Sequence, residues 1–116
     1  MKKFVKEKYA DIILQLCCEY KNRHSADTDR YTQAADRALE TLDKYSNYIL
    51  GMGYMLHMED VPYLIQCIHS LKGQGTTFSD AVLEETAEYL KQLEYIWLIK
   101  KSRVCDSLFL LSVYFN

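Results

Sequence analysis

The fold of this chain depends on residues 79–99, SDAVLEETAEYLKQLEYIWLI, because the spacing of apolar side chains changes within this stretch. One helix face is marked out in its first part by Leu83, Thr86, Ala87, Leu90 and Leu93. This period predicts a helix from about Ser79 to Tyr95. Residues 95–99 are apolar without interruption, which is too dense for an amphipathic helix and typical of a buried strand. We therefore predict that the helix ends near Tyr95 and that a strand follows it.

The residues after this run complete a predicted hairpin. From Ser107 onward the chain alternates in a strand-like way, with Phe109, Leu111, Val113 and Phe115 at every second position. Residues 100–106 are mostly polar and are interpreted as the turn. The sequence therefore predicts a C-terminal β-hairpin. The alternative is a helix that runs from Ser79 past Trp97 with a short apolar tail packed over it, in an all-α bundle of four or five helices.

Two further helices have clear boundaries. A helix from Lys3 to about Asn22 is indicated by the helical spacing of Val5, Tyr9, Ile12, Leu16 and Tyr20. Asp27 or Thr28, in the polar linker after it, is suited to cap the next helix. An acidic pair that ends at Asp60 and a proline at position 62 are typical of a helix start, which predicts a helix over Val61–Leu71.

The helix predicted from about Arg30 to Leu50 carries a heptad-like seam. Its members are Tyr31, Ala35, Ala38, Leu42, Tyr45 and Ile49, at alternating steps of four and three. Such a seam can contact a second chain as a coiled coil. It can equally pack on the first helix as a hairpin, which we favour because the linker is short. The prediction is one mainly helical domain over 1–116, with a helical hairpin at 1–50 and a second part at 51–116.

The second part resembles a winged-helix domain over the run LKQLEYIWLIKKSR, from Leu90 to Arg103, and the apolar segment after it. In that family the recognition helix ends in a Leu-x-x-Leu pair and Leu-Ile-Lys-Lys opens the first wing strand. The resemblance is best over residues 79–115. It implies that residues 49–58 and 61–71 form the first two helices of the core. It also implies a basic wing tip, made of Lys100, Lys101 and Arg103.

A winged helix of this kind implies DNA binding, but its recognition helix here is acidic. The outward positions carry Glu84, Glu85 and Glu88, which would face phosphates and the acceptor-rich base edges. Trp97 also stands where the family has glycine. We therefore expect the surface to bind protein. A DNA-binding regulator with its basic wing, dimeric through the N-terminal helices, is the second hypothesis.

Composition and charge exclude several classes of protein. The chain has 116 residues, 49% hydrophobic and 26% charged, with a net charge of −2, which indicates one globular domain and argues against a strongly basic nucleic-acid coat protein. No signal-peptide pattern and no membrane-length apolar run is present. The cysteines lack the Cys-x-x-Cys spacing of redox or zinc sites, and lie at Cys17, Cys18, Cys67 and Cys105. We expect a cytoplasmic protein with reduced cysteines.

The candidate binding surface is the acidic helix. Its carboxylates are interpreted as a solvated face rather than a metal site, because no histidine follows a glutamate at the spacing of helical-bundle metal sites. Ten tyrosines are present, and tyrosine covers a large area at little conformational cost, which suits interfaces. The expected partner-binding residues are Asp80, Glu84, Glu85, Glu88, Tyr89 and Tyr95. The alternative for the two tyrosines is that they pack under the first two helices.

These patterns favour a non-catalytic protein-interaction module of the inhibitor, immunity-factor or regulatory-adaptor type. Cys67, His69 and His57 lack the spacing of a zinc site, and no catalytic nucleophile or phosphate-binding loop is recognisable. We therefore predict no catalytic residue, cofactor, metal or small-molecule substrate. The expected partner is a protein, with a homodimer as one option, DNA as the alternative and no membrane.

Overall fold

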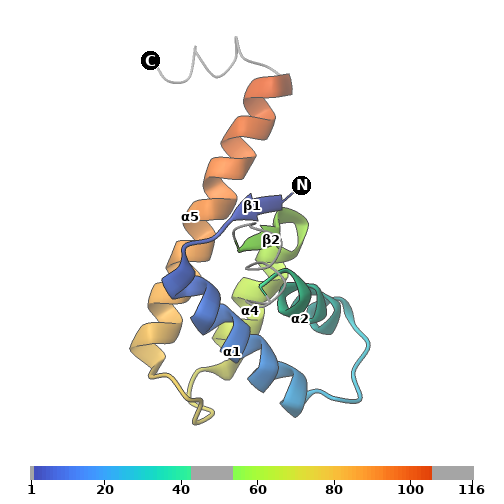
Figure 1. Cartoon of the computed structure of the whole chain (residues 1–116), viewed down its shortest axis with the longest axis vertical. Helices are drawn as coiled ribbons and strands as arrows, with labels where there is room; N and C mark the ends of the chain where they lie inside the picture. Colours follow the sequence, from blue (N-terminus) through green and yellow to red (C-terminus); the bar gives the residue numbers. More distant parts are fainter. Residues whose placement is uncertain (1, 43–53, 106–116) are drawn as a thin grey trace.

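Helices form most of the described part of the chain (Figure 1). This computed structural model describes residues 2–42 and 54–105, and the side chains of 4–42 and 54–99. In chain order the elements are β1 (Lys2–Phe4), α1 (Glu7–Arg23), α2 (Arg30–Thr41), β2 (Met55–His57), the short 3-10 helix η1 (Met58–Asp60), α4 (Val61–Leu71) and α5 (Asp80–Cys105). The mainly helical fold predicted from the sequence is confirmed.

The chain begins with a strand where the sequence predicted a helix. β1 pairs antiparallel with β2, with Phe4 opposite Met55. The Val5 amide extends the pairing by donating to the Tyr54 carbonyl at 2.8 Å. Because α1 begins only at Glu7, the predicted helix start at Lys3 is wrong. The strand assignment of residues 55–57 also corrects the helix that the winged-helix resemblance implied over residues 49–58.

Helices α1 and α2 contact each other as the predicted hairpin. The Asp29 carboxylate caps α2 by accepting a hydrogen bond from the Thr32 amide at 2.9 Å, so the cap is neither Asp27 nor Thr28. Three members of the seam are buried inside the molecule, where α2 contacts α1 and α4: Ala35, Ala38 and Leu42. That part of the seam cannot join a second chain in this fold. Its members Tyr45 and Ile49 lie outside the described residues.

Helix α4 has the bounds predicted for it, Val61–Leu71. Pro62 lies in its first turn, where a missing amide hydrogen costs nothing. The acidic pair that ends at Asp60 was interpreted as a helix-start signal, and Asp60 does stand at the N-cap position, but its side chain makes no capping hydrogen bond. Its carboxylate instead accepts hydrogen bonds from two arginines, which are described below. The loop after α4 contains Gly73 and Gly75 at φ 74° and 71°, a backbone conformation that favours glycine.

Helix α5 corrects the largest prediction from the sequence. Residues 95–99 continue the helix instead of forming a strand, and the backbone of residues 100–105 is helical instead of forming a turn or a wing. The inner face is prolonged by Leu93 and Trp97, which pack against the core at helical spacing after Leu90. This is the continuous helix of the alternative. The predicted return strand, residues 107–115, lies outside the described part.

The last turns of α5 extend beyond the other described helices (Figure 1). The core is formed where α1, α2 and α4 meet and where α5 packs along α4. Among the described residues, no helix has both the length and the apolar composition needed to cross a membrane.

Candidate functional site

The carboxylates near the start of α5 are largely paired within the chain. Glu85 accepts hydrogen bonds from the Tyr9 hydroxyl at 2.9 Å and from Lys8 Nζ at 3.1 Å, and these bonds lower the pKa of Glu85. Glu84 forms an ion pair with Lys72, which lowers the pKa of Glu84 in the same way. These two charges are therefore partly neutralised before any partner binds.

The other two predicted carboxylates have one polar partner each. Asp80 accepts a hydrogen bond from the Gly73 amide at 3.1 Å. Glu88 forms an ion pair with Lys91, at 3.2 Å and one helical turn away. An exposed pair of this kind contributes only a few tenths of a kcal/mol. Either residue can therefore give up this ion pair and pair with a charge of another protein at little cost in free energy.

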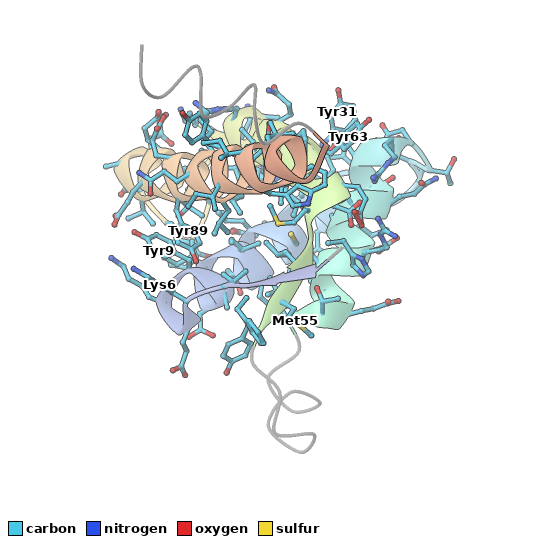
Figure 2. All side chains as sticks on the ribbon, turned by 90° about the horizontal axis from the view of Figure 1, so that it is seen from above. Lys6, Tyr9, Tyr31, Met55, Tyr63 and Tyr89 are labelled. Carbon is cyan, nitrogen blue, oxygen red and sulfur yellow. The ribbon has the colours of Figure 1, made fainter. Side chains whose placement is uncertain are left out.

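Tyr89 packs against α1, as the alternative interpretation held. Its ring stacks on that of Tyr9 with centroids 4.0 Å apart, and its hydroxyl accepts a hydrogen bond from the Lys6 amide at 2.9 Å. Figure 2 shows Lys6, Tyr9 and Tyr89 gathered at one side of the molecule. Tyr89 is thus a contact between α1 and α5, whereas Tyr95 is 64% exposed.

An exposed stripe runs along the outer face of α5. We call it the α5 stripe, and it consists of Asp80, Glu84, Glu88, Lys91, Tyr95 and Leu98, at steps of 4, 4, 3, 4 and 3. All six side chains are exposed. The structure thus places four of the predicted site residues on one face and directs the other two, Glu85 and Tyr89, toward α1.

Large apolar side chains are exposed where α5 leaves the core. Tyr95 is 64% exposed, and Ile96 and Leu98 are each 45% exposed; we call these three residues the apolar turn. Trp97 lies between them and packs against the core. A helix that is apolar on all sides is normally covered on all sides, but only one side of this turn is covered by the described residues.

A groove lies beside the apolar turn, between α4 and α5. It has a volume of about 360 Å³, and its walls are Pro62, Ile65 and Gln66 on α4 and Lys91, Glu94, Tyr95 and Leu98 on α5. A second hollow of about 450 Å³ is lined by Lys91, Gln92, Tyr95 and Ile96. Tyr95 and Lys91 line both hollows.

Ile96, Leu98 and the α4 wall of the groove were missed as site residues. The signal was present in the uninterrupted apolar run 95–99. If this run formed a strand, the hairpin and the core would be expected to cover its side chains. If it forms a helix, apolar side chains point to every side, and the rest of the chain has to cover them or leave them exposed.

A second polar cluster joins α2 to the start of α4. Asp60 is 1% exposed and accepts hydrogen bonds from Arg37 at 2.7 and 2.8 Å and from Arg30 at 2.7 Å. The Arg30 guanidinium also lies over the ring of Tyr63, 4.3 Å from its centroid. Burial raises the pKa of Asp60, but the two arginines outweigh it and hold the pKa below its usual range. These contacts hold α2 against the start of α4, and the sequence analysis did not predict them.

The buried thiols are poorly suited to chemistry. Burial raises the pKa of Cys67 to about 12 and also raises that of Cys17, so both remain protonated at neutral pH. Within residues 4–42 and 54–99, no cluster of three or more histidine, cysteine or carboxylate side chains has the arrangement of a metal site.

No protein-family model matches the chain, and no curated protein or solved structure is significantly similar to it.

Proposed function

We propose that the protein is a non-catalytic protein-interaction module that binds its partner through the apolar turn and the groove beside it. The observation that carries this proposal is the exposure of Tyr95, Ile96 and Leu98 on one turn of α5. Full burial of a large apolar side chain contributes about 1.5–3 kcal/mol. A contiguous surface of such side chains is typical of a binding site.

Tyr95 has the features of an anchor residue. It lines both hollows and is 64% exposed, so much of its surface is available to a partner. Tyrosine is enriched among the few residues that dominate binding energy, because a large rigid ring is buried there while its hydroxyl keeps a polar contact. We therefore assign the centre of the interface to Tyr95.

The acidic residues have a secondary part in this proposal. Glu84, Glu85 and Glu88 each form a partly exposed ion pair within the chain, and of these three Glu88 is the one nearest to Tyr95 along the α5 stripe. Charges at the rim of an interface mainly affect association rate and partner choice. We expect Glu88 to orient a basic group of the partner rather than to supply most of the affinity.

The proposed role is that of an inhibitor, immunity factor or regulatory adaptor, with no catalysis of its own. A cytoplasmic location accords with unpaired, buried thiols at Cys17 and Cys67. The DNA-binding alternative loses its main support, since residues 100, 101 and 103 belong to the helical backbone of α5 and not to a wing.

Site-specific photo-crosslinking in the source cell tests the proposal. A benzophenone-bearing phenylalanine analogue in place of Tyr95 is expected to give discrete protein adducts. The same analogue in place of Gln33, an exposed residue of α2, serves as the control and is expected to give only background. Adducts at position 95 no stronger than those at position 33 would contradict the proposal.

A further inference from the structure

We infer that the outer edge of β1 is a strand-addition site, and that its occupant is the segment 107–115 of the same chain. The inference goes beyond the proposed function, because its evidence lies on β1 and not in the groove between α4 and α5. It rests on the free backbone groups of β1, on two exposed apolar side chains next to them and on the reach of the segment.

Strand β1 has one edge that no described strand covers. The Val5 amide donates to the Tyr54 carbonyl at 2.8 Å. The amide and carbonyl of Phe4 therefore point to the opposite side, away from β2, because neighbouring residues of a strand face alternately. No hydrogen bond from another described residue reaches these two groups. An edge of this kind is a template for pairing with a further strand.

This edge faces α5. The Lys6 amide lies two residues further along the same side of the chain and donates to the Tyr89 hydroxyl at 2.9 Å. Helix α5 continues past β1 (Figure 1), and Ile96 follows Tyr89 by seven residues, so it lies on the same helix face two turns later. Phe4 is 67% exposed and Ile96 is 45% exposed. Two large apolar side chains are thus open just beyond the contact that joins this edge to α5.

The segment 107–115 suits this place. It was predicted to form a strand from the alternation of Phe109, Leu111, Val113 and Phe115, and it contains no charged residue. The strand predicted to pair with it, residues 95–99, is helical, so the hairpin does not form and the segment needs a different edge. Strand β1 offers a free edge with apolar side chains beside it.

The segment is long enough to reach β1. Cys105, the last described residue of α5, follows Ile96 by nine residues, which is about 14 Å along the helix axis. Nine extended residues span about 30 Å, so the segment can return along α5 as far as Phe4. In Figure 1, β1 runs down toward α1 while α5 rises past it. A returning segment therefore runs parallel to β1, and the three strands form a mixed sheet.

Tethering favours this segment over a strand from another molecule. A segment attached to the end of α5 has an effective concentration at the edge of about a millimolar, so it pairs there ahead of a free strand at lower concentration. When it covers Ile96, the groove between α4 and α5 stays open, with Tyr95 and Leu98 in its wall. The partner proposed above keeps that part of its site.

Hydrogen exchange followed by NMR tests the inference in the full-length chain. We expect the Phe4 amide to exchange at least about tenfold more slowly than in the double variant Leu111→Pro with Ser112→Pro, because proline is not tolerated within a strand ladder. The Val5 amide, which is bonded to Tyr54, is the internal control and is expected to stay protected in both chains. Leu111→Val with Ser112→Thr favours a strand and is expected to keep the protection of Phe4. Circular dichroism verifies that the variants are folded.

Photo-crosslinking from position 4 identifies the occupant. A benzophenone-bearing phenylalanine analogue in place of Phe4 of the purified chain is expected to form an adduct within the chain, to the tryptic peptide that follows Arg103. The same analogue in place of Gln33 on α2 is expected to give no adduct to this peptide. Because the contact is intramolecular, the yield is expected to be independent of protein concentration.

Three results would overturn the inference. They are a Phe4 amide that exchanges equally fast in the original chain and the proline variant, the absence of an adduct from position 4 to the peptide after Arg103, and protection or adducts that increase with protein concentration. The last result would assign the edge to a second copy. None of them affects adducts from position 95 to another protein, so this inference and the proposed function fail separately.

Discussion

Tyr9 of α1 and Tyr89 of α5 stack face to face, with ring centroids 4.0 Å apart and planes inclined by only 10°. The same two helices are joined by the hydrogen bond from the Tyr9 hydroxyl to Glu85. That bond and burial raise the pKa of Tyr9. The contact therefore combines an apolar stack with a hydrogen bond to a carboxylate at its edge.

We predict that Tyr89→Ala lowers the free energy of unfolding by about 2–4 kcal/mol, because a partly buried ring and its stacking partner are lost. Tyr89→Phe keeps the ring and removes only the hydroxyl that accepts from the Lys6 amide. Its expected cost is about 1 kcal/mol. Urea unfolding followed by circular dichroism measures both changes, and equal costs would show that the stack contributes nothing.

Asp60→Ala is expected to destabilise the fold by about 2–4 kcal/mol, because it leaves Arg30 and Arg37 without their shared carboxylate. The cost stays below that of a fully buried pair since the arginine side chains are 34% and 43% exposed and keep part of their hydration. Glu40→Ala removes an exposed carboxylate from the same region and is expected to change stability by less than about 0.5 kcal/mol. Thermal and urea unfolding compare the two variants. An equally small loss of stability in Asp60→Ala would show that the Asp60 cluster does not stabilise the fold.

Stability is expected to fall as the pH is lowered below about 4–5. The pKa values of Asp60, Glu84 and Glu85 are lower in the folded chain than their usual values. The unfolded chain therefore takes up protons first, and the stabilisation present at neutral pH is lost as the pH falls through the folded pKa values. Midpoints of thermal unfolding between pH 7 and pH 3 measure this loss. Asp60→Asn is expected to reduce its slope, and an unchanged slope would exclude Asp60 as a contributor.

The thiol of Cys67 is expected to resist alkylation in the folded protein. Burial raises its pKa to about 12, so the reactive thiolate is scarce at pH 8 and is also shielded from reagent. Cys18 is only partly buried and serves as the internal reference. Iodoacetamide labelling followed by peptide mass spectrometry measures both rates. Equal rates for the two thiols would contradict the buried position of Cys67.

The helices that were predicted well have a one-sided apolar pattern and clear start signals. Helix α4 combines Pro62 in its first turn with a loop of glycines after Leu71, and its bounds were predicted correctly. The run 95–99 has no such pattern. A segment that is apolar on every side has neither a helical nor a strand period, so the sequence alone could not distinguish the two.

The contacts that were missed join residues far apart in the sequence. β1 has three residues and its partner β2 is equally short, so neither contains a detectable alternation. The carboxylate of Asp60 meets arginines 23 and 30 residues earlier. No local propensity encodes such a meeting, because it depends on how α2 and α4 are placed by the core. The candidate site was foreseen in Tyr95 and Glu88 but not in Ile96 or Leu98.

The hydrogen bond between Lys6 and Tyr89 joins groups 83 residues apart, and Tyr9 reaches Glu85 across 76 residues. During synthesis, the N-terminal end of α1 is therefore made long before the ring and carboxylate that hold it. While only the first half of the chain has been synthesised, this end of α1 lacks its contacts with α5. Its side that faces α5 in the folded chain then stays uncovered until α5 has been synthesised. Helix α5 is the last described helix to be synthesised, and it therefore supplies the contacts that complete the packing of α1, the first.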